Sequence, residues 1–180
     1  WTLFLATSAW VLAAPAQAED DQAAELAKKL SNPLASLISV PVQYNRDEYG
    51  GANDGATVSR VIFQPVIPFS LNENWNLITR TLIPLVDQQD FPVAAVNESG
   101  LGDITSSLYF SPKSPTAAGW IWGAGPVLLL PTATEDVLGT EKWGIGPTGV
   151  VLKQTGPWTV GMLAGHIWSV AGDDSRDDVS

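Results

Sequence analysis

The sequence lacks cysteine altogether, and it is poor in charged residues, histidine and methionine. The absence of cysteine excludes a disulfide-stapled scaffold and any metal site built on thiolates. Charged residues make up 16% of the 180 residues, whereas a soluble domain usually carries about 25%. The few charges sum to −10, which argues against a nucleic-acid partner. The length allows about one domain.

Long apolar runs are also missing after residue 18, so no transmembrane helix is expected there. Residues 1–18 are apolar and end in Ala16-Gln17-Ala18, the small-x-small pattern of a signal-peptidase site. They predict a signal peptide whose basic n-region is missing. A transmembrane helix is the alternative, which the short run disfavours. The chain ends in a polar stretch without a closing strand, so we expect a fragment whose C-terminal strands are missing.

Residues 19–33 predict a periplasmic N-terminal segment with a short helix. Acidic residues lead this helix and lysines close it, which suits the helix dipole, and Pro33 stops it. From residue 34 to residue 180, alternating apolar and polar residues predict part of a barrel with about seven strands. The strands are expected at 36–44, 57–69, 75–86, 102–110, 119–131, 143–155 and 158–169.

The last of these runs points most directly to a membrane. Trp158 and Trp168 lie ten residues apart on one face of the run, which is roughly 33 Å along a strand. A tilt of about 40° reduces this to roughly 25 Å along the membrane normal, the height of the apolar band of an outer-membrane barrel. Aromatic rings prefer the two rims of that band. The predicted fold class is therefore all-β, an antiparallel transmembrane β-barrel.

The connections between the runs alternate between short and long, which is typical of short periplasmic turns and long external loops. The long connections hold most of the acidic residues. Solubilised loop tips are one interpretation of this charge. The other is contact with lipopolysaccharide phosphates through divalent cations, since carboxylates favour hard cations. The short connections are 70–74, 111–118 and 156–157, and the long ones are 45–56, 87–101, 132–142 and 170–180.

Four polar residues are candidates for lining the barrel interior and contacting a solute: Arg60, Gln64, Arg80 and Asp103. A charge that faces lipid at mid-membrane costs about 2–4 kcal/mol, so Arg60 and Arg80 are expected to face inward. A turn centred near Asn72 would make Gln64 and Arg80 cross-strand neighbours. Apolar residues share the inward face, which suits a narrow lumen and a weakly charged solute. The alternative is a small barrel filled by its own side chains.

Tryptophans fall near the ends of the expected strands, as the aromatic girdles of a barrel require. Prolines within the strands are the main observation against a closed barrel, because proline cannot donate to a ladder and prefers edges, strand starts or bulges. Pro65 and Pro126 are the hardest to accommodate. The six girdle candidates are Trp75, Trp120, Trp122, Trp143, Trp158 and Trp168.

Several segments together carry a resemblance to a known family. They are N-P-L-A-S-L-I-S-V-P-V-Q-Y-N at 32–45, Q-P-V-I-P-F-S-L-N-E-N-W-N-L-I-T-R-T-L-I-P-L at 64–85, S-G-L-G-D-I at 99–104, Y-F-S-P-K at 109–113, W-G-A-G-P-V-L-L-L-P-T-A-T at 122–134 and G-I-G-P-T-G-V-V-L-K-Q at 144–154. This ordered set resembles the MetA-pathway of phenol degradation family of outer-membrane proteins. The resemblance implies an outer-membrane β-barrel for uptake of small aromatic compounds. It supplies no catalytic motif, and prolines lie inside the matching segments.

No motif for catalysis, phosphate binding or metal binding is found, so we expect neither an enzyme nor a cofactor. The single histidine, His166, lies three residues before Ser169, which puts the two side chains on opposite faces of a strand. A Ser–His pair needs hydrogen-bond reach, so this spacing disfavours a hydrolase. Next to Trp168, His166 is instead expected to lie at the membrane interface.

Together these patterns predict a barrel in the bacterial outer membrane that passes or binds a small aromatic or hydrophobic solute. Its expected partners are outer-membrane lipids, lipopolysaccharide and that solute. The first alternative is a structural barrel with a filled lumen and no transport. The second is a secreted, soluble β-sandwich that binds a ligand, which fractionation without detergent would distinguish.

Overall fold

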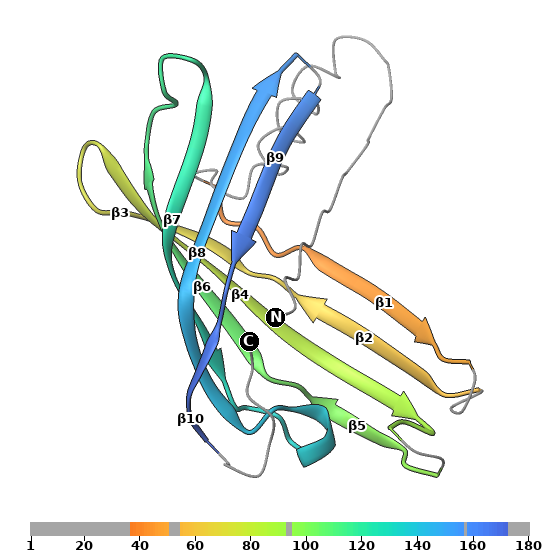
Figure 1. The fold of residues 1–180 in the computed structure, drawn as a ribbon. Helices are drawn as coiled ribbons and strands as arrows, with labels where there is room; N and C mark the ends of the chain where they lie inside the picture. Colours follow the sequence, from red (N-terminus) through yellow and green to blue (C-terminus); the bar gives the residue numbers. More distant parts are fainter. Residues whose placement is uncertain (1–36, 51–54, 93–94, 157, 173–180) are drawn as a thin grey trace.

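The computed structural model describes residues 37–50, 55–92, 95–156 and 158–172. Their strands form one antiparallel sheet that curls into a half-barrel (Figure 1). Within these ranges there is no α-helix, and none of the chain described here could cross a membrane as a helix. The prediction of an all-β fold is confirmed. The predicted signal peptide at 1–18 and the helix of segment 19–33 lie outside the described residues.

The sheet has ten strands, and three pairs of them are halves of longer strands. The spatial order is β1-β2-β4-β6-β7-β8-β10; β3 and β5 also pair with β4, and β9 with β8. Joining β2 to β3, β5 to β6 and β9 to β10 leaves seven long strands within the described residues, which agrees with the number expected from the alternation. The strands are β1 (Val42–Glu48), β2 (Thr57–Phe63), β3 (Val66–Ser70), β4 (Trp75–Gln89), β5 (Glu98–Leu101), β6 (Ile104–Pro112), β7 (Trp120–Leu130), β8 (Lys142–Thr155), β9 (Trp158–Gly165) and β10 (Trp168–Gly172).

Prolines coincide with the interruptions of these long strands. Pro65 lies in the break between β2 and β3, where its carbonyl still accepts a bond from the Thr81 N–H at 3.1 Å. Pro84 of β4 lies beside the break between β5 and β6, and its carbonyl accepts a bond from the Gly102 N–H at 2.9 Å. A residue without an N–H cannot donate to the ladder. The strand that holds Pro65 is interrupted at the proline itself, whereas at Pro84 the neighbouring strand is interrupted and β4 continues.

Pro126 and Pro147 directly oppose each other in the pairing of β7 with β8. His166 lies beyond Pro147 in the break between β9 and β10, and its N–H donates to the Pro147 carbonyl at 3.0 Å. Neither proline therefore has to donate within the β7–β8 pair. Pro65, in the break between β2 and β3, and Pro126, opposite Pro147, therefore both occupy positions where the ladder tolerates a proline.

The expected strand boundaries were wrong at several ends. The first strand runs over 42–48 and not 36–44, because it begins only after Pro41, where Ser39 makes an isolated bridge to Val66. The strand expected at 75–86 continues to Gln89, where it pairs with β5, a strand that the alternation missed. The runs expected at 57–69 and 158–169 are interrupted as described above, and the run expected at 102–110 begins only at Ile104 and continues to Pro112.

Cross-strand register separates two faces of the curled sheet. One face, called the inner face here, carries the fully buried Ile78 and Tyr109, which are opposite each other in the β4–β6 pair. The other, the outer face, carries large exposed apolar side chains such as Phe63, Phe110 and Ile145. Because paired residues point to the same side of a sheet, the register assigns the remaining strand residues to one face or the other.

The inner face is closely packed in one region. Val66, Ile78, Tyr109 and Val150 form a buried apolar cluster there. The Tyr109 hydroxyl lies 3.4 Å from the Thr148 hydroxyl on β8, two strands away from β6. Between them lies Gly125 of β7, which pairs with Thr148. These residues fill part of the space that the sheet curls around.

Candidate functional site

A row of polar side chains crosses the inner face from β1 to β4. Arg80 of β4 donates from Nη2 to Oε1 of Gln64 at 2.5 Å, and the Gln64 amide nitrogen donates to Oε1 of Gln43 at 3.0 Å. Gln43 in turn donates to Oδ1 of Asn45 at 2.9 Å. The predicted contact between Gln64 and Arg80 is therefore confirmed, although Arg80 pairs directly with Val66 and reaches Gln64 diagonally. We call the residues Gln43, Asn45, Asp47, Arg60, Gln64 and Arg80 the inner polar row.

The inner polar row continues toward the loop end of β1 and β2 as an ion pair. Arg60 donates from Nη1 to Oδ2 of Asp47, and the side chains keep 35% and 50% of their exposure. At such exposure an ion pair contributes at most about 1 kcal/mol to stability. The main effect of the ion pair is to position Arg60, because the Asp47 carboxylate holds the guanidinium over the sheet. Arg60 shares its face with Val86, its partner on β4.

The sequence did not indicate the β1 half of this row. Asn45 and Asp47 were assigned to a loop because the first strand was expected to end at residue 44. The apolar–polar alternation ends at Tyr44, since residues 45–48 are all polar, so the local pattern gave no signal for these two residues. An acidic residue on this face also matches Arg60 across the strand pair.

Asp103, the fourth candidate for lining the interior, has a different environment. Its Oδ1 accepts bonds from the Thr132 and Ala133 N–H groups, both at 3.1 Å. Its Oδ2 accepts the N–H and hydroxyl of Thr140, at 2.6 and 2.7 Å. Asp103 is therefore separate from the inner polar row, and its carboxylate holds the connection between β7 and β8.

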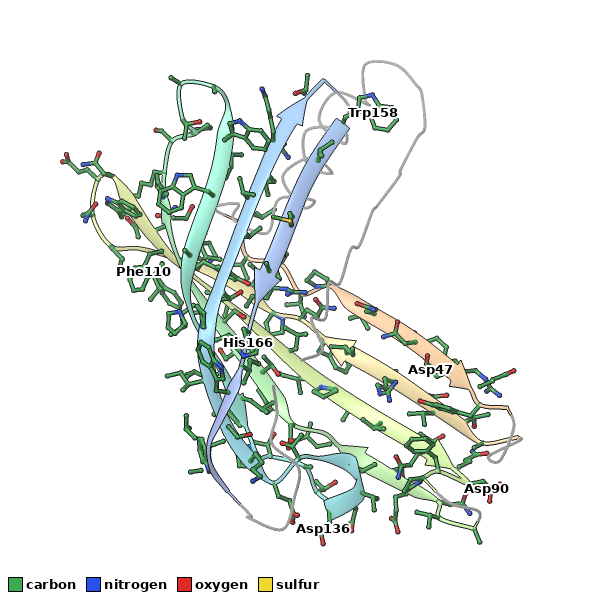
Figure 2. All side chains as sticks on the ribbon, in the orientation of Figure 1. Asp47, Asp90, Phe110, Asp136, Trp158 and His166 are labelled. Atoms are coloured by element: carbon green, nitrogen blue, oxygen red, sulfur yellow. The ribbon has the colours of Figure 1, made fainter. Side chains whose placement is uncertain are left out.

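The six tryptophans of the expected girdle are partly exposed and gather at the two ends of the sheet. Trp75, Trp120 and Trp122 lie where β4 and β7 begin, and Trp75 meets Trp122 edge to face at 5.9 Å between ring centres. Trp158 begins β9 at this same end, whereas Asp136 and Asp90 lie at the opposite end (Figure 2). Trp143 and Trp168 begin β8 and β10 at that opposite end.

We call these two ends of the sheet the short-turn end and the long-loop end. The short-turn end carries the connections 71–74, 113–119 and that between β8 and β9. The long-loop end carries the connections that follow β1, β4 and β7. A cation and the histidine each contact a tryptophan near these ends. Lys153 lies 5.6 Å above the Trp120 ring, and His166 packs edge to face on Trp168 at 4.6 Å.

Hydrogen bonding is the chemistry that the inner polar row offers. Amide oxygens, amide nitrogens and two guanidinium groups can orient a small polar group while neighbouring apolar side chains contact its hydrocarbon part. His166 packs on Trp168 of the outer face, away from this row. Among the residues that the structure describes, no cluster of histidine and carboxylate side chains could hold a metal ion.

Comparison with known proteins found no matching family model, no similar curated protein and no similar solved structure.

Proposed function

We propose that this chain forms part of a β-barrel in the bacterial outer membrane that binds or passes a small solute along its inner face. An aromatic or otherwise hydrophobic solute fits the mixed lining of amides, arginines and aliphatic groups. Outer-membrane lipids and lipopolysaccharide are its proposed surroundings. The resemblance to the phenol-degradation family of transporters is consistent with this function and remains a proposal.

The outer face supports the membrane part of the proposal. Exposed apolar residues continue across strands that are far apart in the sheet, from Val42 and Tyr44 on β1 to Val160 and Met162 on β9. Large contiguous apolar surfaces on a protein mark a contact with another protein or a membrane. Here tryptophans flank the apolar surface at both ends, which is the arrangement that two membrane–water interfaces favour.

The inner polar row is the observation that carries the solute part of the proposal. An arginine on the outer face at the middle of a strand would cost about 2–4 kcal/mol in lipid. Arg80 lies near the middle of β4, on the inner face, and is held by Gln64. The Arg80 guanidinium, held beside the side-chain amides of the inner polar row, gives a narrow interior a defined place to bind a polar group.

The test is planar-bilayer recording of the protein purified from its membrane. Arg80→Ala removes the inner arginine and is expected to change the single-channel conductance or the rate of solute uptake, because it removes a positive charge from the passage. Arg46→Ala is the matched control, since Arg46 is exposed and paired with Glu48 near the end of β1. Equal conductance and uptake in wild type and Arg80→Ala would contradict the assignment of Arg80 to the passage.

A structural barrel with a filled interior is the second candidate, and one observation favours it. Ile78 and Tyr109 are completely buried on the inner face, although both belong to the wall of the sheet. A filled barrel would give no current steps in the same recordings. A soluble protein, the third possibility, would appear in fractions prepared without detergent.

A further inference from the structure

The connection between β7 and β8, residues 131–141, packs on the inner face of the sheet. Gly100 of β5 pairs with Val86, whose other partner is Arg60, so all three share the inner face. A Cβ added to Gly100 would lie 2.0 Å from Thr134 Oγ1 and 3.2 Å from Leu138 Cδ1. With a threonine at position 134, only a residue without a side chain fits there, because the threonine hydroxyl occupies that space. We call residues 131–141 the inner strap.

The inner strap is fixed to the wall by hydrogen bonds on both of its arms. Asp103 binds Thr132 and Ala133 on the first arm and Thr140 on the second, as described above. Thr134 donates its N–H to the Leu101 carbonyl at 3.0 Å, and its hydroxyl accepts the Leu101 N–H at 3.2 Å. A charged acceptor with several donors forms stronger bonds than neutral pairs do. The strap is therefore built as a fixed element.

The strap also places negative charge at the long-loop end. Residues 131–142 contain three carboxylates, on Glu135, Asp136 and Glu141, and one cation, Lys142. Glu135 and Asp136 are exposed, and a hollow of about 210 Å³ lies among Asp103, these residues and Glu141. Asp136 lies at the end of the molecule, beyond the strands (Figure 2). Carboxylates at the mouth of a passage attract cations and repel anions.

We propose that the inner strap is a constriction at the long-loop mouth of the passage, held by Asp103, and that its carboxylates make the passage prefer cations to anions. This inference rests on the proposed function, since a constriction needs a passage. Asp103 acts as a positioning residue, because its own carboxylate is engaged by the strap.

The position of the strap can be tested without any conductance. The chain has no cysteine of its own, so an engineered pair is unambiguous. In Gly100→Cys with Thr134→Cys, the Cβ atoms would lie 3.4 Å apart, close to the usual disulfide range of about 3.5–4.5 Å. We expect this pair to form a disulfide in the folded protein on mild oxidation. Asp87→Cys with Thr134→Cys is the control, because Asp87, beside Val86 on β4, faces outward and its pair should stay reduced.

The constriction is tested by planar-bilayer recording. Asp103→Asn should release the strap and raise the single-channel conductance by roughly twofold or more. If the strap is the cause, adding the Gly100→Cys and Thr134→Cys pair to this variant should return the conductance to the wild-type level when oxidised, and not when reduced. Neutralising Glu135, Asp136 and Glu141 to their amides should lower the cation-to-anion permeability ratio. Asp87→Asn, on the outer face, should leave this ratio unchanged.

The outcomes separate the two proposals. Conductance without the disulfide overturns the inner strap, and so does an Asp103→Asn conductance that oxidation does not reverse. An unchanged permeability ratio in the triple amide variant overturns the charge selectivity. If the double-cysteine variant forms the disulfide but neither wild type nor any variant conducts, the proposed transport function is overturned. The position of the inner strap on the wall would still stand.

Discussion

At the scale of the residue, missing side chains on the inner face matter as much as those that are present. Gly100 leaves room for the inner strap, and Gly125 of β7 lies against the backbone of the neighbouring strand β6. A Cβ on Gly125 would meet the Leu108 carbonyl oxygen at 1.9 Å, which is backbone and cannot move aside cheaply. Gly149 is different, since a Cβ there would be 3.7 Å from the nearest heavy atom.

This contrast yields a paired prediction for two glycine substitutions in neighbouring strands. Gly125→Ala should lower the free energy of unfolding by about 1–3 kcal/mol, as overpacking of a filled core does. Gly149→Ala should change it by well under 1 kcal/mol, because the added methyl makes only ordinary contacts. Urea titration followed by tryptophan fluorescence in lipid vesicles measures both. Equal midpoints for the two variants would show that the space at Gly125 is not needed.

At the scale of the element, each long strand combines a lipid-compatible face with an inward face. In β4, Leu82 pairs with Thr105 and Ile83 pairs with Phe63. Phe63 is on the exposed outer face, so the adjacent residues Leu82 and Ile83 point to opposite sides near the middle of the strand. If the outer face contacts lipid, an ionic group is tolerated at only one of the two positions.

Ile83→Arg and Leu82→Arg test this asymmetry at nearly equal depth. Arginine at 83 should cost about 2–4 kcal/mol of folding free energy in a bilayer, since it faces hydrocarbon. Arginine at 82 should cost less, because it faces the side that already holds Arg80. Urea unfolding in vesicles gives both free energies. A larger loss for Leu82→Arg than for Ile83→Arg would reverse the assignment of the faces.

At the scale of the whole molecule, the two ends of the sheet differ in length of connection and in charge. Acidic residues gather at the long-loop end, whereas the short-turn end carries Lys113, Glu73 and Lys153, which lies above the Trp120 ring. Long loops are typical of the external side of an outer-membrane barrel and short turns of the periplasmic side. In the proposed barrel, the long-loop end is therefore expected to face the outside of the cell.

Cysteine labelling in intact cells tests this orientation, because the chain has no cysteine of its own to react. Val137→Cys lies in the inner strap at the long-loop end, and Ser114→Cys lies in the connection 113–119; both positions are exposed. A membrane-impermeant maleimide should label Val137→Cys in whole cells. It should reach Ser114→Cys only after the outer membrane is permeabilised. The opposite pattern would invert the orientation, and labelling of neither position after lysis would show that neither connection is exposed to water.

The sequence by itself determined the strand class, the number of long strands and the two faces. A period of two between apolar and polar residues leaves little choice of side for each side chain, which is why the contact of Arg80 with Gln64 was predictable. The sequence did not determine where strands end or are interrupted. Pro41 and Pro65 mark boundaries, but whether a proline ends, interrupts or merely faces a strand depends on the partner strand.

Only the tertiary structure decided the role of Asp103 and the place of residues 131–141. A local pattern of apolar and polar residues contains no information about contacts with residues that are distant in sequence. It therefore predicts a connection between strands to be a solvated loop. Asp103 is engaged by Thr140, 37 positions away, and Gly100 leaves space for Thr134. Such contacts arise from how the sheet curls. The Asp103 carboxylate and the space at Gly100 together fix residues 131–141 to the wall, whereas the local pattern assigned these residues to solvent.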